Sequence, residues 1–155
     1  MFKQLSITCL FLSSNYYLLA LPVIAENSIA FNSTTISPPI SLTPNTALPD
    51  TLIGKVTVKS GSVNGFIVNV QSMNGGSLRR SSGELISYTL SYNGVDQGQL
   101  PTIGKSVENV SNMITDCADE NGCTRDIKIA ISQTAIAAKP AGSYSDQLTF
   151  TLIAK

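Results

Sequence analysis

The sequence predicts an all-β protein, an antiparallel β-sandwich of about seven strands. Three observations support this fold class. Apolar and polar side chains alternate with a period of two in most segments, as in half-buried strands. Asn-Gly pairs and other glycines recur between these segments, roughly every 8–12 residues, at the positions that turns require. No segment sustains the 3.6-residue period of an amphipathic helix.

Residues 1–25 read as a secretory signal peptide. Lys3 supplies the positive start, an apolar stretch follows, and Val23 and Ala25 occupy the −3 and −1 positions of a cleavage site. A retained membrane anchor is the alternative, but polar residues and Pro22 interrupt the segment. We therefore expect three parts: the signal peptide at 1–25, an N-terminal extension and edge strand at 26–42, and the β-sandwich domain at 43–155.

The extension is rich in Ser, Thr, Asn and Pro. Ile29 and Phe31 alternate briefly with polar residues. Two prolines then interrupt, and Ile40 and Leu42 alternate again. Because proline within a sheet is confined to edges and bulges, we expect a short edge strand at Ile40–Leu42.

The first two strands of the body carry alternating valines. Leu52, Val56 and Val58 share one face with Gly54, and the second strand then repeats the pattern. The buried face of the second strand is predicted to hold Phe66, Val68 and Val70. Asn74-Gly75-Gly76 follows and predicts a hairpin, because Asn and Gly tolerate positive φ.

The sequence predicts one long strand and one short strand in the middle of the chain. Alternation over residues 84–92 predicts a strand that buries Ile86, Tyr88, Leu90 and Tyr92. Asn93-Gly94 indicates another hairpin, and a short strand is expected within residues 95–100.

The last third begins with its least strand-like part, residues 107–123, where we expect one short helical turn. Ile127, Ile129 and Ile131 then predict a strand, residues 135–142 a linker, and Leu148, Phe150 and Leu152 the final strand.

Two cysteines, Cys117 and Cys123, remain after signal cleavage. An even pair in an exported protein favours a disulfide, which here would close the loop CADENGC. A redox pair is the alternative, but the spacing is not C-x-x-C and no cationic neighbour would clearly depress a thiol pKa.

Charge and composition narrow the function classes. The chain has 10 basic and 10 acidic residues, so nothing steers it toward nucleic acid or an anionic membrane. It has no histidine and no tryptophan, which excludes histidine-dependent nucleophiles and histidine-ligated zinc. The acids Glu84, Asp96, Glu108, Asp126 and Asp146 are scattered, so we expect no enzyme activity, no catalytic residues and no cofactor. We also expect no metal, although the acidic loop Asp116 to Asn121 offers oxygen ligands that leave calcium open.

The order of motifs resembles that of bacterial pilus subunits secreted by the chaperone–usher route, including the spore-coat-protein-U-like group. The segments that carry this resemblance are KVTVKSGSVNGFIVNVQSMNGG, SYTLSYNG and the ending PAGSYSDQLTFTL. The positions that match the terminal strand of that family are Gly142, Tyr144, Asp146, Leu148, Phe150 and Leu152.

The resemblance implies an immunoglobulin-like sandwich that lacks one strand. In that family a periplasmic chaperone first lends a strand, and the extension of the next subunit then replaces it. The implied strand donors are Ile29 and Phe31, and the implied acceptor edge is the strand with Leu148, Phe150 and Leu152. Function is then expected to be structural or adhesive at the cell surface. Its partners would be a periplasmic chaperone and other copies or related subunits, with no membrane contact after cleavage. The alternative is a stand-alone extracellular module with a complete sandwich that binds cell wall or glycan.

Overall fold

A computed structural model describes residues 27–32 and 40–155, and the signal peptide predicted at 1–25 lies outside them. Ten strands and two helices of four residues each make up the regular structure of the described part. All strand pairs are antiparallel, which confirms the predicted all-β class.

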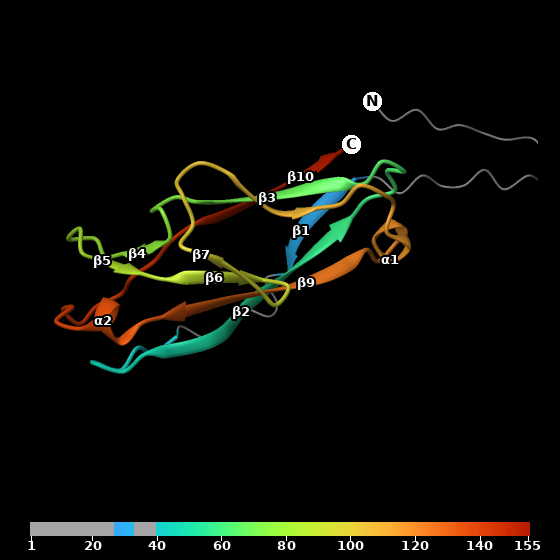
Figure 1. Ribbon diagram of the computed structural model, residues 1–155. Helices are drawn as coiled ribbons and strands as arrows, with labels where there is room; N and C mark the ends of the chain where they lie inside the picture. Colours follow the sequence, from blue (N-terminus) through green and yellow to red (C-terminus); the bar gives the residue numbers. More distant parts are fainter. Residues whose placement is uncertain (1–26, 33–39) are drawn as a thin grey trace, which may run out of the picture.

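The larger sheet has the strand order β1-β2-β9-β6-β7. Its long central pair is β2 and β9, and β1 and β7 form its two edges (Figure 1). The bounds are β1 Ser28–Asn32, β2 Leu48–Lys59, β6 Thr89–Tyr92, β7 Val95–Gly98 and β9 Cys123–Ile131.

The second sheet has the order β10-β3-β8, so β3 is its central strand. A separate two-stranded ribbon pairs β4 with β5. The bounds are β3 Phe66–Ser72, β4 Ser77–Arg79, β5 Leu85–Ser87, β8 Lys105–Asn109 and β10 Leu148–Ala154.

One hydrophobic core draws side chains from both sheets. Val56 and Val58 come from the larger sheet, and Val68 and Val70 from the smaller one, each 0 % exposed. Every strand residue predicted to face inward between positions 54 and 131 is buried, because the period of two places alternate side chains on one face. The immunoglobulin-like topology remains a prediction.

The strand predicted over residues 84–92 is divided into β5 and β6 at Tyr88. The N–H of Tyr88 donates to the carbonyl of Gly76 (3.0 Å), which continues the β4–β5 register by one residue pair. Beyond Tyr88 the chain changes partners: β5 pairs with β4, whereas β6 pairs with β9 and β7. The alternation of side chains continues unbroken across the division, which is why the sequence shows only one strand.

The edge strand predicted at Ile40–Leu42 is wrong. Residues 40–42 form no strand, and the edge of the sheet is β1, which lies earlier in the chain. Proline on both sides of this short segment, at Pro39 and Pro44, removes the N–H groups that a ladder needs. Its two apolar side chains still pack against the core.

The two short helices cap the ends of β9. Helix α1, Thr115–Ala118, is the predicted helical turn, and Cys117 within it is disulfide-bonded to Cys123 at the start of β9. The Ser60 N–H also donates to the Cys117 carbonyl (2.8 Å), so this turn is fastened to the end of β2. Helix α2, Gln133–Ile136, falls partly in the predicted linker and is capped by the Ser132 hydroxyl, which accepts from the Ala135 N–H. No helix in the described ranges is both long and apolar enough to cross a membrane.

Candidate functional site: the outer edge of strand β10

Strand β10 is the last strand of the chain and lies at the edge of the smaller sheet (Figure 1). It pairs antiparallel with β3 along its whole length, from Leu148 opposite Ser72 to Ala154 opposite Phe66. Among the described residues, β3 is its only strand partner in the sheet. The sequence correctly predicts a strand here, and the structure adds that it is an edge strand.

Two backbone hydrogen bonds establish which backbone groups of β10 face β3. The Gln147 carbonyl accepts from the Met73 N–H (2.9 Å), and the Lys155 N–H donates to the Gly65 carbonyl (3.0 Å). Because alternate residues of an antiparallel strand bond to the same neighbour, the odd-numbered residues between them also face β3. The even-numbered residues therefore direct their N–H and C=O groups away from β3, as Leu148, Leu152 and Ala154 do.

The apolar side chains of β10 face the core but are only half-buried. Leu148, Phe150 and Leu152 pack against the core cluster, whereas the corresponding side chains on β3 are completely covered. The strand has no proline and no charged residue from Leu148 to Ala154. Natural proteins usually place such residues on edge strands to prevent further pairing, and β10 lacks these protections.

Strand β1 borders the same side of the molecule. It pairs antiparallel with β2 at the edge of the larger sheet and lies next to β10. Ile29, a predicted strand donor, is half-buried against the core of its own chain. The Asn27 side-chain carbonyl accepts from the Ser60 hydroxyl (2.7 Å) just before the strand. Phe31, the other predicted donor, lies in β1, but its side chain is outside the described part.

The opposite side of the molecule is closed by polar contacts. There β7 and β8 are the edges of the two sheets, and the Lys105 ammonium on β8 donates to the Gln97 carbonyl on β7. Both strands carry charged side chains and have an irregular register, which hinders edge pairing. The two sides therefore differ: the β7–β8 side is charged and linked by side chains, whereas the β1–β10 side is apolar.

A half-buried ion pair reinforces the closed side. Arg125 on β9 donates to both carboxylate oxygens of Glu108 on β8, with the closest contact at 2.7 Å. The two side chains are 12 % and 16 % exposed, and the pair joins the two sheets. The Tyr92 hydroxyl donates to the same carboxylate (2.7 Å). The hydrogen bond to Glu108 raises the pKa of the Arg125 guanidinium, which stays charged.

A second polar cluster fixes the start of β10. The Asp146 carboxylate accepts from the hydroxyls of Ser72 and Tyr88, both at 2.6 Å. It also accepts from the backbone N–H groups of Asn74 (3.0 Å) and Gln147 (2.8 Å). This single side chain thus ties the strand to the end of β3 and to the β5–β6 junction. We assign it a structural role in positioning the edge.

Burial of the two tyrosines predicts a loss of stability in alkali. Burial is the largest cause that raises the phenol pKa of Tyr88 and of Tyr92 above the ordinary value of 10.0, and a hydrogen bond to a carboxylate is the second. The unfolded chain ionises these phenols first, so their contribution to folding is fully present below pH 10 and is lost as pH rises further. We expect the unfolding midpoint to fall steeply above pH 10, and less so in Y88F and Y92F. Denaturant titration at several pH values would measure it, and a wild-type midpoint unchanged up to pH 12 would contradict it.

The acidic loop, residues 116–121, spans the end of α1 and the turn before β9. No group of three or more Asp, Glu, Cys or His side chains gathers there or elsewhere within the described ranges. The side chains of Asp116, Asp119 and Glu120 are exposed, and the Glu120 carbonyl accepts from the Lys59 ammonium (2.9 Å).

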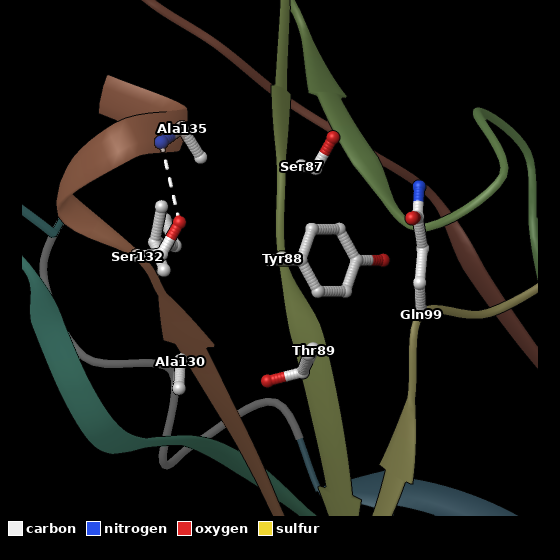
Figure 2. Close-up of a pocket in the computed structure, with 8 residues that line it drawn as sticks. Ser87, Tyr88, Thr89, Gln99, Ala130, Ser132 and Ala135 are labelled. Carbon is white, nitrogen blue, oxygen red and sulfur yellow. Dashed lines mark hydrogen bonds between the residues drawn. The ribbon is translucent and has the colours of Figure 1, made fainter. Parts of the chain in front are cut away.

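One shallow, open cavity of about 320 Å³ lies where β5 and β6 pass β9 and α2 (Figure 2). Ser87, Thr89 and Ser132 are among its lining residues, and the Tyr88 ring points away from Ser132. Its lining residues include no carboxylate and no thiol, so they offer no paired acid and base.

In the sequence, Glu108 and Asp146 are two of several scattered acids. Each instead accepts several hydrogen bonds at a half-buried position. Asp146 belongs to the motif that matches the pilus-subunit ending, so the sequence does single this residue out. Nothing near Glu108 in the sequence indicates a contact with Arg125.

No protein-family model matches the chain, and no curated protein is significantly similar to it.

Proposed function

We propose that the protein is a secreted, non-catalytic structural or adhesive protein that passes through the periplasm to the cell surface. It assembles, as pilus subunits do, by adding a strand to the outer edge of β10. The observation that carries this proposal is the contrast between the two sides of the molecule. The β7–β8 side is charged and linked by side chains, whereas β10 directs backbone groups outward and leaves its core-facing apolar side chains only half-buried.

The chemistry of such an edge suits an extended peptide. Outward N–H and C=O groups supply main-chain hydrogen bonds, and the half-buried side chains leave room for the alternate side chains of a new strand. The partners we propose are a periplasmic chaperone that covers the edge first, and then another copy or a related subunit. The segment containing Ile29 and Phe31 is the proposed donor.

A charge placed on the apolar face of β10 tests the proposal. Leu152→Lys puts an ammonium where the added strand would bury it, while in the single subunit the long side chain can still reach water. We expect assembly of the chain from Glu26 to weaken by at least about 100-fold, because a buried unpaired charge costs several kcal/mol.

Thr151→Lys is the matched control, because the neighbouring Thr151 side chain is exposed on the other face of the same strand. Light scattering across a concentration series would measure assembly, and thermal unfolding would show that both variants fold. Equal assembly of the two variants would contradict the proposal.

A second candidate is a stand-alone extracellular module that binds cell wall or glycan through its loops. The placement of β1 favours it, because β1 pairs with β2 of its own chain and Ile29 packs on its own core. On this reading the wild type and both lysine variants would all be monomers.

A further inference from the structure

Four Asn-Gly pairs occur in the sequence, at 64–65, 74–75, 93–94 and 121–122. In such a pair the backbone nitrogen of glycine can attack the side-chain amide carbon of asparagine, because glycine has no side chain to obstruct the approach. The reaction needs a glycine N–H that can lose its proton and space for a five-membered ring. These two requirements separate one pair from the other three.

The glycine N–H is hydrogen-bonded in three of the pairs. Gly65 donates to the Ser62 carbonyl (3.1 Å), Gly75 to the Ser72 carbonyl (3.4 Å) and Gly122 to the Asp119 carbonyl (3.0 Å). The Gly94 N–H has no hydrogen-bond acceptor within the described ranges. Asn93 and Gly94 are the two central residues of the β6–β7 hairpin, with φ of 48° and 80°, and a hairpin of this type leaves its second central N–H unbonded.

Space around the glycines gives the same ranking. A methyl group placed on Gly65 would lie 2.1 Å from the Val110 carbonyl oxygen, and one on Gly122 would lie 2.6 Å from that of Val58. One on Gly75 would lie 3.4 Å from the Thr102 methyl group. A methyl group placed on Gly94 would meet no atom within 4 Å beyond the adjacent residues, and both Asn93 and Gly94 are exposed.

We infer that Asn93 is a site of spontaneous modification, deamidating through a succinimide while the protein remains folded. The bond from the Gly94 nitrogen to the Asn93 Cγ forms, and the bond from Cγ to Nδ2 breaks. Nδ2 leaves as ammonia with the proton from the glycine nitrogen. Water then opens the imide at either carbonyl and yields aspartate or isoaspartate, with no change of oxidation state.

The modification would alter the edge of the larger sheet. The Asn93 N–H donates to the Asp126 carbonyl (2.8 Å), and the next residues begin β7. Isoaspartate lengthens the backbone by one methylene group and adds a negative charge beside Asp96. We therefore expect β7 to pair less well with β6 after conversion, while the distant β10 edge is unaffected.

Hydroxylamine tests the inference, because it attacks succinimides and cleaves the chain at reacting Asn-Gly bonds. The folded full chain should be cleaved after Asn93 about tenfold faster than at the other three pairs, as expected when one N–H is unbonded and the others are bonded. The same chain in denaturant is the internal control, because all four bonds should then react at similar rates. Mass spectrometry of the fragments would assign each site.

Asn93→Gly is the matched variant, since glycine keeps the positive φ of the turn and removes the side-chain amide. It should lose the fast native cleavage and keep the four-residue turn geometry, as shown by an unchanged midpoint of denaturant unfolding. Native cleavage that is absent, equal at all four pairs or fastest at another pair would overturn the inference. These results do not depend on whether the chain assembles.

Discussion

Gly65→Ala is expected to destabilise the protein by at least about 4 kcal/mol, which places it among the most damaging single substitutions. Gly65 has φ of 82°, a conformation that costs an alanine about 1–2 kcal/mol. The added methyl group would also meet the Val110 carbonyl oxygen at 2.1 Å. That carbonyl accepts from the Phe66 N–H, and the Gly65 carbonyl accepts from the Lys155 N–H. The clash therefore loosens β3 from β8 and from β10 together.

Gly94→Ala is the matched control for this substitution. Gly94 has nearly the same φ, 80°, but the space around it is open. The Gly94→Ala variant should therefore lose only the conformational part of the free energy of unfolding, about 1–2 kcal/mol. Urea unfolding of the two variants would measure the difference. Equal losses would show that contact with the Val110 carbonyl is not what requires glycine at position 65.

Arg125→Met is expected to cost about 3–5 kcal/mol, because it leaves the half-buried Glu108 carboxylate without its cation. The methionine keeps most of the aliphatic packing, so the loss reports the charge and its hydrogen bonds. The Tyr92 hydroxyl still donates to the carboxylate but cannot neutralise it. Since the ion pair joins β8 to β9, the two sheets should separate more easily on this side.

The double variant Arg125→Met, Glu108→Leu separates the pair from its parts. Replacing both charges by apolar groups should restore most of the loss, because no unpaired charge then remains buried. Denaturant unfolding of the wild type, both single variants and the double variant completes the cycle. A double variant as unstable as the sum of the singles would contradict this account of the pair.

Local patterns in the sequence predict most strands and turns, because a period of two and Asn-Gly pairs act within a few residues. Asn93-Gly94 marks its hairpin, and Ile127 to Ile131 mark the buried face of β9. Helix α2 was missed because four residues carry no periodic signal, and Ser132 is its only local mark.

Contacts between residues that are far apart in the sequence cannot be predicted from such local patterns. Glu108 and Arg125 are 17 residues apart, and Ser72 and Asp146 are 74 apart. The sequence around Glu108 or Asp146 does not indicate which distant residue its carboxylate contacts. The sequence likewise predicts β10 as a strand without indicating which neighbours it has, since the order of strands in a sheet depends on the whole fold. The candidate site is therefore a property of the topology, while its apolar alternation is visible in the sequence.

Amide hydrogen exchange resolved along β10 tests the central claim most directly. In the monomeric chain from Glu26, the amides of Leu148, Leu152 and Ala154 should exchange quickly, because they point away from β3. The amides of Thr149, Thr151 and Ile153, which face β3, should be protected. Adding a peptide of residues 26–40 should protect the first set as a new strand pairs with the edge. Protection of that set in the monomer before any peptide is added, or its continued rapid exchange with the peptide in excess, would contradict strand addition at β10.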